Sequence, residues 1–253
     1  MYDKNEIDIS YNYLKKVISK INEPIVIIGG WATYFSVNKN YKKEFNSDYL
    51  GSRDVDLGFN DVKSLKETTT ILEKEGFNFI SFRYLKEIHY DTGKELTKEE
   101  SITLPGFKIF NMYVDVIISE TNDEISKELG FHPVDEPLIK LIFQDTKYRI
   151  ELIEFDRKLW LPSPFLLLAG KVNSIVNRTM DHKRIKDYCD IIALCLYSEE
   201  DINHIIDLSK KYILQENIIK LNQLINNNDL QQVSTILTID INIIKQILNK
   251  IIS

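Results

Sequence analysis

The sequence has little of what marks secreted, membrane-bound or zinc-binding proteins. Only two cysteines, Cys189 and Cys195, occur in 253 residues, and no cysteine or histidine lies at a spacing that completes a zinc site. No run reaches the ~18 apolar residues of a membrane span, and charges near the first residue interrupt any signal-peptide core. We therefore expect a cytoplasmic protein without membrane contact, in which both cysteines are core thiols.

A basic excess is also missing. The chain has 32 lysines and arginines against 38 aspartates and glutamates, a net charge of −6. The overall field therefore does not attract nucleic acid, and any polyanionic partner must meet a local basic patch. With 43% hydrophobic and 28% charged residues, and only nine glycines and six prolines, the composition is that of an ordinary globular protein.

Two kinds of hydrophobic pattern divide the chain. Strand-like and helical patterns alternate in the first part, whereas the last part has helical spacing almost throughout. The proline-rich run 161–164 is the best linker candidate. We predict an α+β fold with a mixed β-sheet flanked by helices over residues 1–162 and a helical domain over 163–253. Within the first domain, residues 38–50 and 86–100 are expected to be exposed, the former as an insertion.

A strand-like run over residues 25–28 leads into Gly29 and Gly30 and then into a helical pattern. A helix N-terminus offers free N–H groups and the positive end of the helix dipole, and glycine lets a phosphate approach the backbone. The turn is equally consistent with a structural role, because the three spaced glycines of a Rossmann motif are absent.

Three aspartates interrupt strand-like segments. Asp54 and Asp56 lie two apart and share one face of the strand predicted over 55–59. Asp115 lies inside the apolar strand 109–118, where a charge is costly unless it is paired or bound to a metal. Three such carboxylates can hold two Mg²⁺ ions about 4 Å apart. The alternative is that they are solvated acids, with Asp115 on an edge facing water.

A basic segment follows the linker. Lys171 and Arg178 are seven residues apart, which is two helical turns, so both side chains point the same way. Between residues 171 and 186 the chain has five basic residues and one acid, which makes this the best candidate for binding nucleotide phosphates or RNA. The alternative is a solvated helix supported by pairs such as Lys186 with Asp190.

The order of these features resembles the nucleotidyltransferase superfamily that includes DNA polymerase β. The segment from Lys171 to Asp190 resembles the K…R…KDxxD motif of AbiEii-type nucleotidyltransferases, which include abortive-infection and type IV toxin–antitoxin toxins. The resemblance covers roughly residues 22–197. It implies a nucleotidyltransferase domain over 1–162 and transfer of a nucleoside monophosphate from a nucleoside triphosphate to an acceptor hydroxyl, with release of pyrophosphate.

The resemblance also implies residue roles and cofactors. Two Mg²⁺ ions, with Mn²⁺ as an alternative, are expected at Asp54, Asp56 and Asp115. Asp187 is expected to orient a basic residue or to act as a base on the acceptor. Many members have a serine after the first glycine, which here is replaced by the hydroxyl of Ser52 or Thr33. The expected nucleotide-binding residues are Gly29, Gly30, Ser52, Lys171, Arg178 and Lys186, in a cleft between the two domains.

The acceptor and the partners stay open at this stage. The family implies an RNA end such as that of tRNA, or a protein hydroxyl, but the acidic net charge gives no independent support for RNA. A small-molecule acceptor, as in aminoglycoside-modifying relatives, is one alternative. A non-catalytic, antitoxin-like protein that binds a nucleotide or a partner is another, against which the intact acid triad argues. The oligomeric state is not determined by the sequence.

Overall fold

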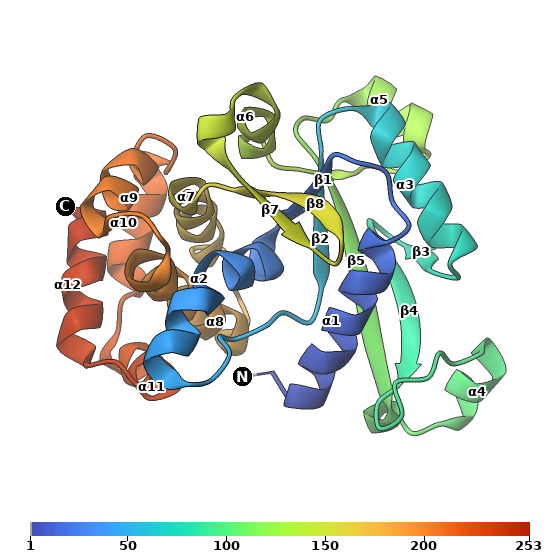
Figure 1. The fold of residues 1–253 in the computed structure, drawn as a ribbon, viewed down its shortest axis with the longest axis horizontal. Helices are drawn as coiled ribbons and strands as arrows, with labels where there is room; N and C mark the ends of the chain where they lie inside the picture. The colour runs from blue at the N-terminus through green and yellow to red at the C-terminus, as the bar shows by residue number, and fades with distance from the viewer. Residues whose placement is uncertain (1) are drawn as a thin grey trace. The chain divides into compact units, whose positions relative to one another are not determined.

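The computed structural model describes residues 2–253 and contains an eight-stranded mixed sheet, with a series of helices after the last strand (Figure 1). The strand order is β3-β4-β5-β2-β1-β8-β7, and β6 pairs with β5. This architecture confirms the predicted α+β class with a helical C-terminal part. The strands are β1 (Ile25–Ile28), β2 (Val55–Phe59), β3 (Asn78–Ile80), β4 (Arg83–His89), β5 (Ile109–Ile118), β6 (Val134–Asp135), β7 (Arg149–Glu154) and β8 (Arg157–Pro162).

The helices fall into two groups along the chain. Those interspersed with the strands are α1 (Lys4–Ile18), α2 (Gly29–Phe45), α3 (Val62–Lys74), α4 (Lys98–Thr103), α5 (Asp123–Leu129) and α6 (Leu138–Gln144). Those after the last strand are α7 (Pro164–Ile175), α8 (Asp181–Tyr197), α9 (Ile202–Ser209), α10 (Gln215–Leu224), α11 (Asn227–Leu237) and α12 (Ile241–Ile252). No helix within residues 2–253 combines the length and the apolar character needed to cross a bilayer.

Side-chain alternation separates a buried face of the sheet from a more accessible one. β2 runs parallel to β5 with Asp56 beside Asp115, and β4 runs antiparallel to β5. Leu57 and Val116 are buried, and burial of each such side chain contributes about 2 kcal/mol. Because successive side chains of a strand point to opposite faces, Asp56 and Asp115 project from the other face. A register slip of one residue would exchange the two sets, so the hydrophobic burial fixes where the carboxylates lie.

Helices α1 and α3 pack on the buried face, against β5 and, for α3, also β2 (Figure 1). The exposed turn predicted over residues 86–100 is confirmed for most of 91–100, but it begins after β4 and not at Lys86, which is only 4% exposed and packs over the ring of Phe77. The Lys86 ammonium lies 2.8 Å from Glu95, and Lys16 of α1 lies 2.6 Å from the same carboxylate. Partial burial favours a higher pKa for Glu95, but the hydrogen bonds from Lys16 and Lys86 outweigh it and lower the pKa to about 2.

The described chain forms two compact units. The first, which we call the sheet unit, consists of Tyr2–Trp31 and Leu50–Leu161; the second, the helical unit, consists of Ala32–Tyr49 and Pro162–Ser253. The sequence-based division placed all of residues 1–162 in one domain. The structure differs in that Ala32–Tyr49 groups with the C-terminal helices.

Residues 38–50, predicted as an exposed insertion, continue α2 as far as Phe45, and although their lysines are exposed, their aromatic side chains are not. The reason is an aromatic cluster inside the helical unit. The ring of Tyr41 lies 4.6 Å from that of Phe45 and 5.2 Å from those of Tyr49 and Tyr197. Tyr41 and Tyr49 are therefore buried. The polar residues between the aromatic positions of this segment concealed its apolar face.

Helix α8 supplies much of the core of the helical unit. Both cysteines lie on it, and the structure confirms that they are free and buried. Burial raises the pKa of Cys189 and of Cys195 to about 12. Both are therefore inert thiols at neutral pH.

Candidate active site

Three of the predicted site residues come together on the accessible face of the sheet unit. The pairing of β2 with β5 sets Asp56 beside Asp115, and Asp54 precedes Asp56 by two positions. A single guanidinium reaches two of the carboxylates: Nη2 of Arg83 lies 2.6 Å from Oδ2 of Asp115 and 3.4 Å from Oδ2 of Asp54. We call Asp54, Asp56, Asp115 and Arg83 the acid cluster. Its net charge is −2, from three carboxylates and one guanidinium.

Arg83 is the residue of this site that the sequence analysis missed. It stands beside Asp115 in the β4–β5 register and binds it with two hydrogen bonds, Nε to Oδ1 at 2.7 Å and Nη2 to Oδ2 at 2.6 Å. The guanidinium also stacks on the ring of Tyr113 at 3.9 Å. Burial favours a lower pKa for Arg83, but Asp115, Asp54 and Asp56 together raise it, so the positive charge is permanent. The available signal was the arginine itself, between the apolar residues of the segment 77–85, but its register against Asp115 could not be deduced.

The Gly29-Gly30 turn lies directly against this cluster. Gly29 has a φ of +64°, which favours glycine, and a β-carbon there would lie 2.1 Å from Oδ2 of Asp56. A β-carbon on Gly30 would lie 2.6 Å from Oγ of Ser52. The first residues of α2 are therefore closely surrounded by the Asp56 carboxylate and the Ser52 hydroxyl. Of the two hydroxyls expected to replace the family's serine, Ser52 is the one beside Gly30. Ser52 is 9% exposed, and Thr33 is fully buried.

The carboxylates do not fit a metal ion as they are arranged here. Among residues 2–253, no group of three or more histidine, cysteine, aspartate or glutamate side chains is placed to hold one. The donor oxygens are of the kind that Mg²⁺ prefers. However, both oxygens of Asp115 accept hydrogen bonds from Arg83. The two Mg²⁺ ions therefore stay a prediction from the motif.

In the helical unit, the K…R…KDxxD residues form a buried ionic network. Nζ of Lys171 lies 2.9 Å from Oδ1 of Asp187 and 2.7 Å from Oδ2 of Asp190. Arg178 binds the other oxygen of Asp187 at 2.6 Å, and Lys186 binds Oδ1 of Asp190. Lys171 and Arg178 share the partner Asp187, but the helical spacing predicted for them is wrong, because α7 ends at Ile175 and Arg178 lies beyond it. We call these five residues the ionic network.

A role in nucleotide binding predicts that Lys171 and Arg178 are exposed, which is wrong for Lys171 but not for Arg178. The side chains of Asp187 and Asp190 are 3% and 0% exposed and that of Lys171 only 11%, whereas Arg178 reaches 36%. Burial favours a lower pKa for the Lys171 ammonium, but Asp187 and Asp190 reverse the effect and raise it. The Asp190 pKa is lowered, because Lys171 and Lys186 outweigh its own burial. The nearby Tyr49 hydroxyl adds a hydrogen bond to Asp190 at 2.8 Å.

Asp187 accepts hydrogen bonds from Lys171 and Arg178, and its two expected roles, orienting a basic residue or acting as a base on the acceptor, stay predictions. Nucleotide binding by Lys171, Arg178 and Lys186 stays a prediction. The pair Lys186–Asp190, considered as helix support in the sequence, is present. The network contains three cations and two acids, so its net charge is +1.

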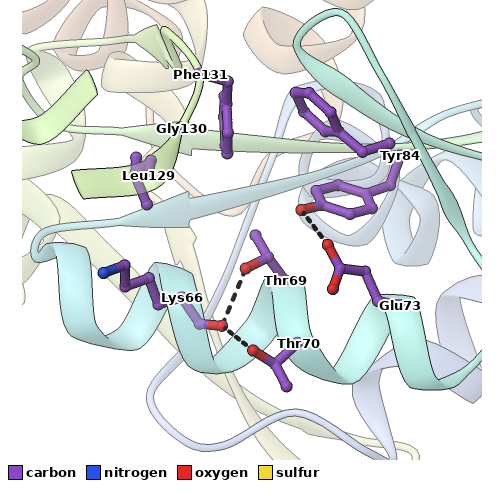
Figure 2. Close-up of a pocket in the computed structure, with 9 residues that line it drawn as sticks. Lys66, Thr69, Thr70, Glu73, Tyr84, Leu129, Gly130 and Phe131 are labelled. Carbon is purple, nitrogen blue, oxygen red and sulfur yellow. Dashed lines mark hydrogen bonds between the residues drawn. The ribbon is translucent and has the colours of Figure 1, made fainter. Parts of the chain in front are cut away.

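A separate pocket of about 320 Å³ lies beside α3 in the sheet unit (Figure 2). Phe79, Tyr84 and Phe131 supply aromatic walls, and Thr69 lines it from α3. Tyr84 and Arg83 are consecutive in β4, so their side chains point to opposite faces of the sheet. The pocket is therefore on the face opposite the acid cluster.

Together, the fold and the acid cluster define an α+β protein with a carboxylate-rich site on its sheet. No protein-family model matches the chain, and no curated protein matches it. Among solved structures, it is similar to an antigenic nucleotidyltransferase-like protein from Paracoccidioides brasiliensis, with 20% identity over 92% of this chain and 93% of that one and a TM-score of 0.41. A likeness this distant assigns neither residues nor activity. The AbiEii-type resemblance stays a prediction.

Proposed function

We propose that the chain is a nucleotidyltransferase that moves a nucleoside monophosphate from a nucleoside triphosphate to an acceptor hydroxyl. The observation that carries the proposal is the position of Asp54, Asp56 and Asp115 on one sheet face, against the Gly29-Gly30 start of α2. A strand, a glycine turn and a carboxylate cluster in this order match the motif on which the resemblance rests. All of these residues belong to the sheet unit.

The residues of the turn suit the binding of phosphate. The helix of 17 residues that begins at Gly29 directs its N-terminal N–H groups and its positive dipole end there. Glycine at both positions keeps side chains away from the approach, and the Ser52 hydroxyl beside Gly30 can donate a hydrogen bond to a phosphate oxygen. Arg83 adds a positive charge at the same face.

In the proposed reaction, the acceptor oxygen attacks the α-phosphorus in line with the leaving group. A new oxygen–phosphorus bond forms, the bond from the α-phosphorus to the bridging oxygen breaks, and pyrophosphate leaves. The proton of the acceptor hydroxyl passes to a carboxylate, for which we propose Asp56, because it lies closest to the glycine turn. Mg²⁺ or Mn²⁺ would neutralise charge on the phosphates, and Asp54, Asp56 and Asp115 would hold the ion only after Arg83 had released Asp115.

An RNA end such as that of tRNA, a protein hydroxyl and a small molecule are the acceptor classes we propose to test. One observation favours a non-catalytic nucleotide binder as the second candidate. Both oxygens of Asp115, which the motif assigns to metal binding, accept hydrogen bonds from Arg83. A protein that only binds nucleotides can keep that arrangement throughout.

The test is pyrophosphate release and label transfer from each of the labelled nucleoside triphosphates, with Mg²⁺ or Mn²⁺ and with total cellular RNA present. We expect release by the wild type and a loss of two or more orders of magnitude in Asp56→Asn, since each ~1.4 kcal/mol of lost transition-state stabilisation lowers the rate tenfold. Asp123→Asn, an exposed aspartate in the first turn of α5, is the matched control and should keep full activity. No release across the panel would favour the non-catalytic candidate, and equal release by wild type and Asp56→Asn would contradict the role proposed for Asp56.

A further inference from the structure

We propose that Arg83 is a built-in counter-cation that excludes divalent metal ions from the acid cluster, so that a metal ion binds Asp115 only after Arg83 has left it. The inference deepens the proposed function and rests on it for the identity of the competing ion. It makes Arg83 the residue that sets the metal affinity of the site.

The pairing of Arg83 with Asp115 is a consequence of strand register. The antiparallel ladder of β4 and β5 places the two residues directly beside each other, and alternation directs both to the accessible face. The planar fork of the guanidinium matches the two carboxylate oxygens at 2.7 and 2.6 Å. Such bidentate pairs are the strongest of the charge-assisted hydrogen bonds.

Further contacts hold the guanidinium at this position. The Tyr113 ring lies 3.9 Å beneath it, and Asp54 lies 3.4 Å from Nη2. The Arg83 side chain is 21% exposed, so the pair is partly shielded from water. Arg83 is thus fixed by a ring and by two carboxylates rather than extended into solvent.

Arg83 and a metal ion compete for the same oxygens. Mg²⁺ binds carboxylate oxygen at about 2.0–2.1 Å with near-octahedral directions, whereas both Asp115 oxygens are committed to N–H groups of Arg83. A divalent ion placed among the three aspartates would also be repelled by the nearby guanidinium. The bidentate pair and the charge of Arg83 therefore both oppose metal binding at Asp115, and a different rotamer of Arg83 would remove both.

The chain offers a closely matched control residue. Arg149, also in the sheet unit, stacks on Trp160 at 3.8 Å and pairs with Glu151 at 2.8 Å, and its side chain is 11% exposed. It has the same side chain, a similar aromatic support and a carboxylate partner, but it is not part of the acid cluster. Substituting Arg149 therefore controls for the loss of stability that follows the removal of any stacked, ion-paired arginine.

The test measures Mn²⁺ binding by electron paramagnetic resonance of the free ion, without nucleotide and at constant ionic strength. We expect Arg83→Gln to bind Mn²⁺ at least ten-fold more tightly than the wild type, and Arg149→Gln to bind like the wild type. The double variant Arg83→Gln/Asp115→Asn should lose the gain. Equal affinity in the wild type and Arg83→Gln, or the same gain in Arg149→Gln, would overturn the proposal.

Arg83→Lys covers the case in which Arg83→Gln does not fold. It keeps the positive charge and loses the fork, so we expect a gain in Mn²⁺ affinity smaller than that of full removal but measurable; no gain would count against the competition. Because the measurement uses metal alone, it is independent of turnover. Tighter Mn²⁺ binding without any nucleotidyl transfer would retain this inference and remove the proposed function. Nucleotidyl transfer by the wild type, with the same Mn²⁺ affinity in Arg83→Gln as in the wild type, would support the proposed function and overturn this inference.

Discussion

Replacing Lys171 with methionine should destabilise the helical unit strongly. The ammonium lies 2.9 Å from Asp187 and 2.7 Å from Asp190. At these distances and an effective dielectric constant of about 20, each attraction is roughly 6 kcal/mol before the cost of desolvation is subtracted. Desolvation of several kcal/mol per ion offsets most of this. Removal of one partner leaves buried carboxylates with fewer counter-ions, for which the loss is about 3–5 kcal/mol.

Two features place the expected value at the lower end of that range. Asp187 retains Arg178, and Asp190 retains Lys186 and the Tyr49 hydroxyl. Methionine also keeps most of the length and apolar contact of the lysine side chain. We therefore expect Lys171→Met to lower the free energy of unfolding by about 3 kcal/mol.

The measurement is urea-induced unfolding followed by far-UV circular dichroism, together with nucleotide binding by equilibrium dialysis. Lys220→Met is the matched control, because Lys220 pairs with Glu216 on α10 with both side chains largely exposed, at 47% and 67%. Such a pair contributes about 0–1 kcal/mol. If Lys171→Met proved as stable as Lys220→Met while nucleotide affinity fell, the reasoning would be refuted and Lys171 would act as the phosphate ligand that the motif implied.

Two more predictions concern the sheet unit. Gly29→Ala should lower the free energy of unfolding by about 2–3 kcal/mol, because the added methyl group clashes with the Asp56 carboxylate and the positive φ strains the backbone. The control Gly93→Ala has a φ of +67° but no neighbour within 4 Å, so it should show only the strain of about 1 kcal/mol. Equal losses of stability in the two variants would contradict the clash. Glu95, whose pKa is lowered to about 2 by two lysines despite partial burial, contributes stability that is present above its unfolded pKa near 4.5 and is lost as the pH falls toward 2. Because the Glu95 side chain is 45% exposed, its contribution to stability is of order 1 kcal/mol. In Glu95→Gln, the urea midpoint should therefore depend less on pH between 4.5 and about 2. An unchanged pH dependence would contradict the contribution of Glu95.

Hydrophobic patterning predicted the elements well where burial alone decides them. The strands expected over 55–59 and 109–118 are β2 and β5 with those bounds. It was less successful where a polar sequence conceals contacts made elsewhere in the chain. Residues 38–45 are helical because Tyr41 meets Tyr197, a partner more than 150 positions away.

The same distinction applies to the candidate site. Asp54 and Asp56 share a face through local alternation, which a sequence shows directly. The presence of Arg83 among the acids depends on which residue of β4 stands opposite Asp115, and that register is set by tertiary packing. Burial of Lys171 was equally hidden, because helical spacing gives the direction of a side chain and not what lies against it.

The positions of the two tryptophans give the sheet unit a fluorescence signal of its own. Trp31 and Trp160 are the only tryptophans of the chain, and both belong to the sheet unit. Trp31 is 1% exposed and donates a hydrogen bond to Ser10, while Trp160 lies against the Arg149 guanidinium. Intrinsic tryptophan fluorescence therefore reports on the sheet unit, whereas a helical dichroism signal reports on both units, because the helices α7–α12 contain only about half of the α-helical residues. Comparing the two traces in one titration would show whether the units unfold together or in sequence, without any added label.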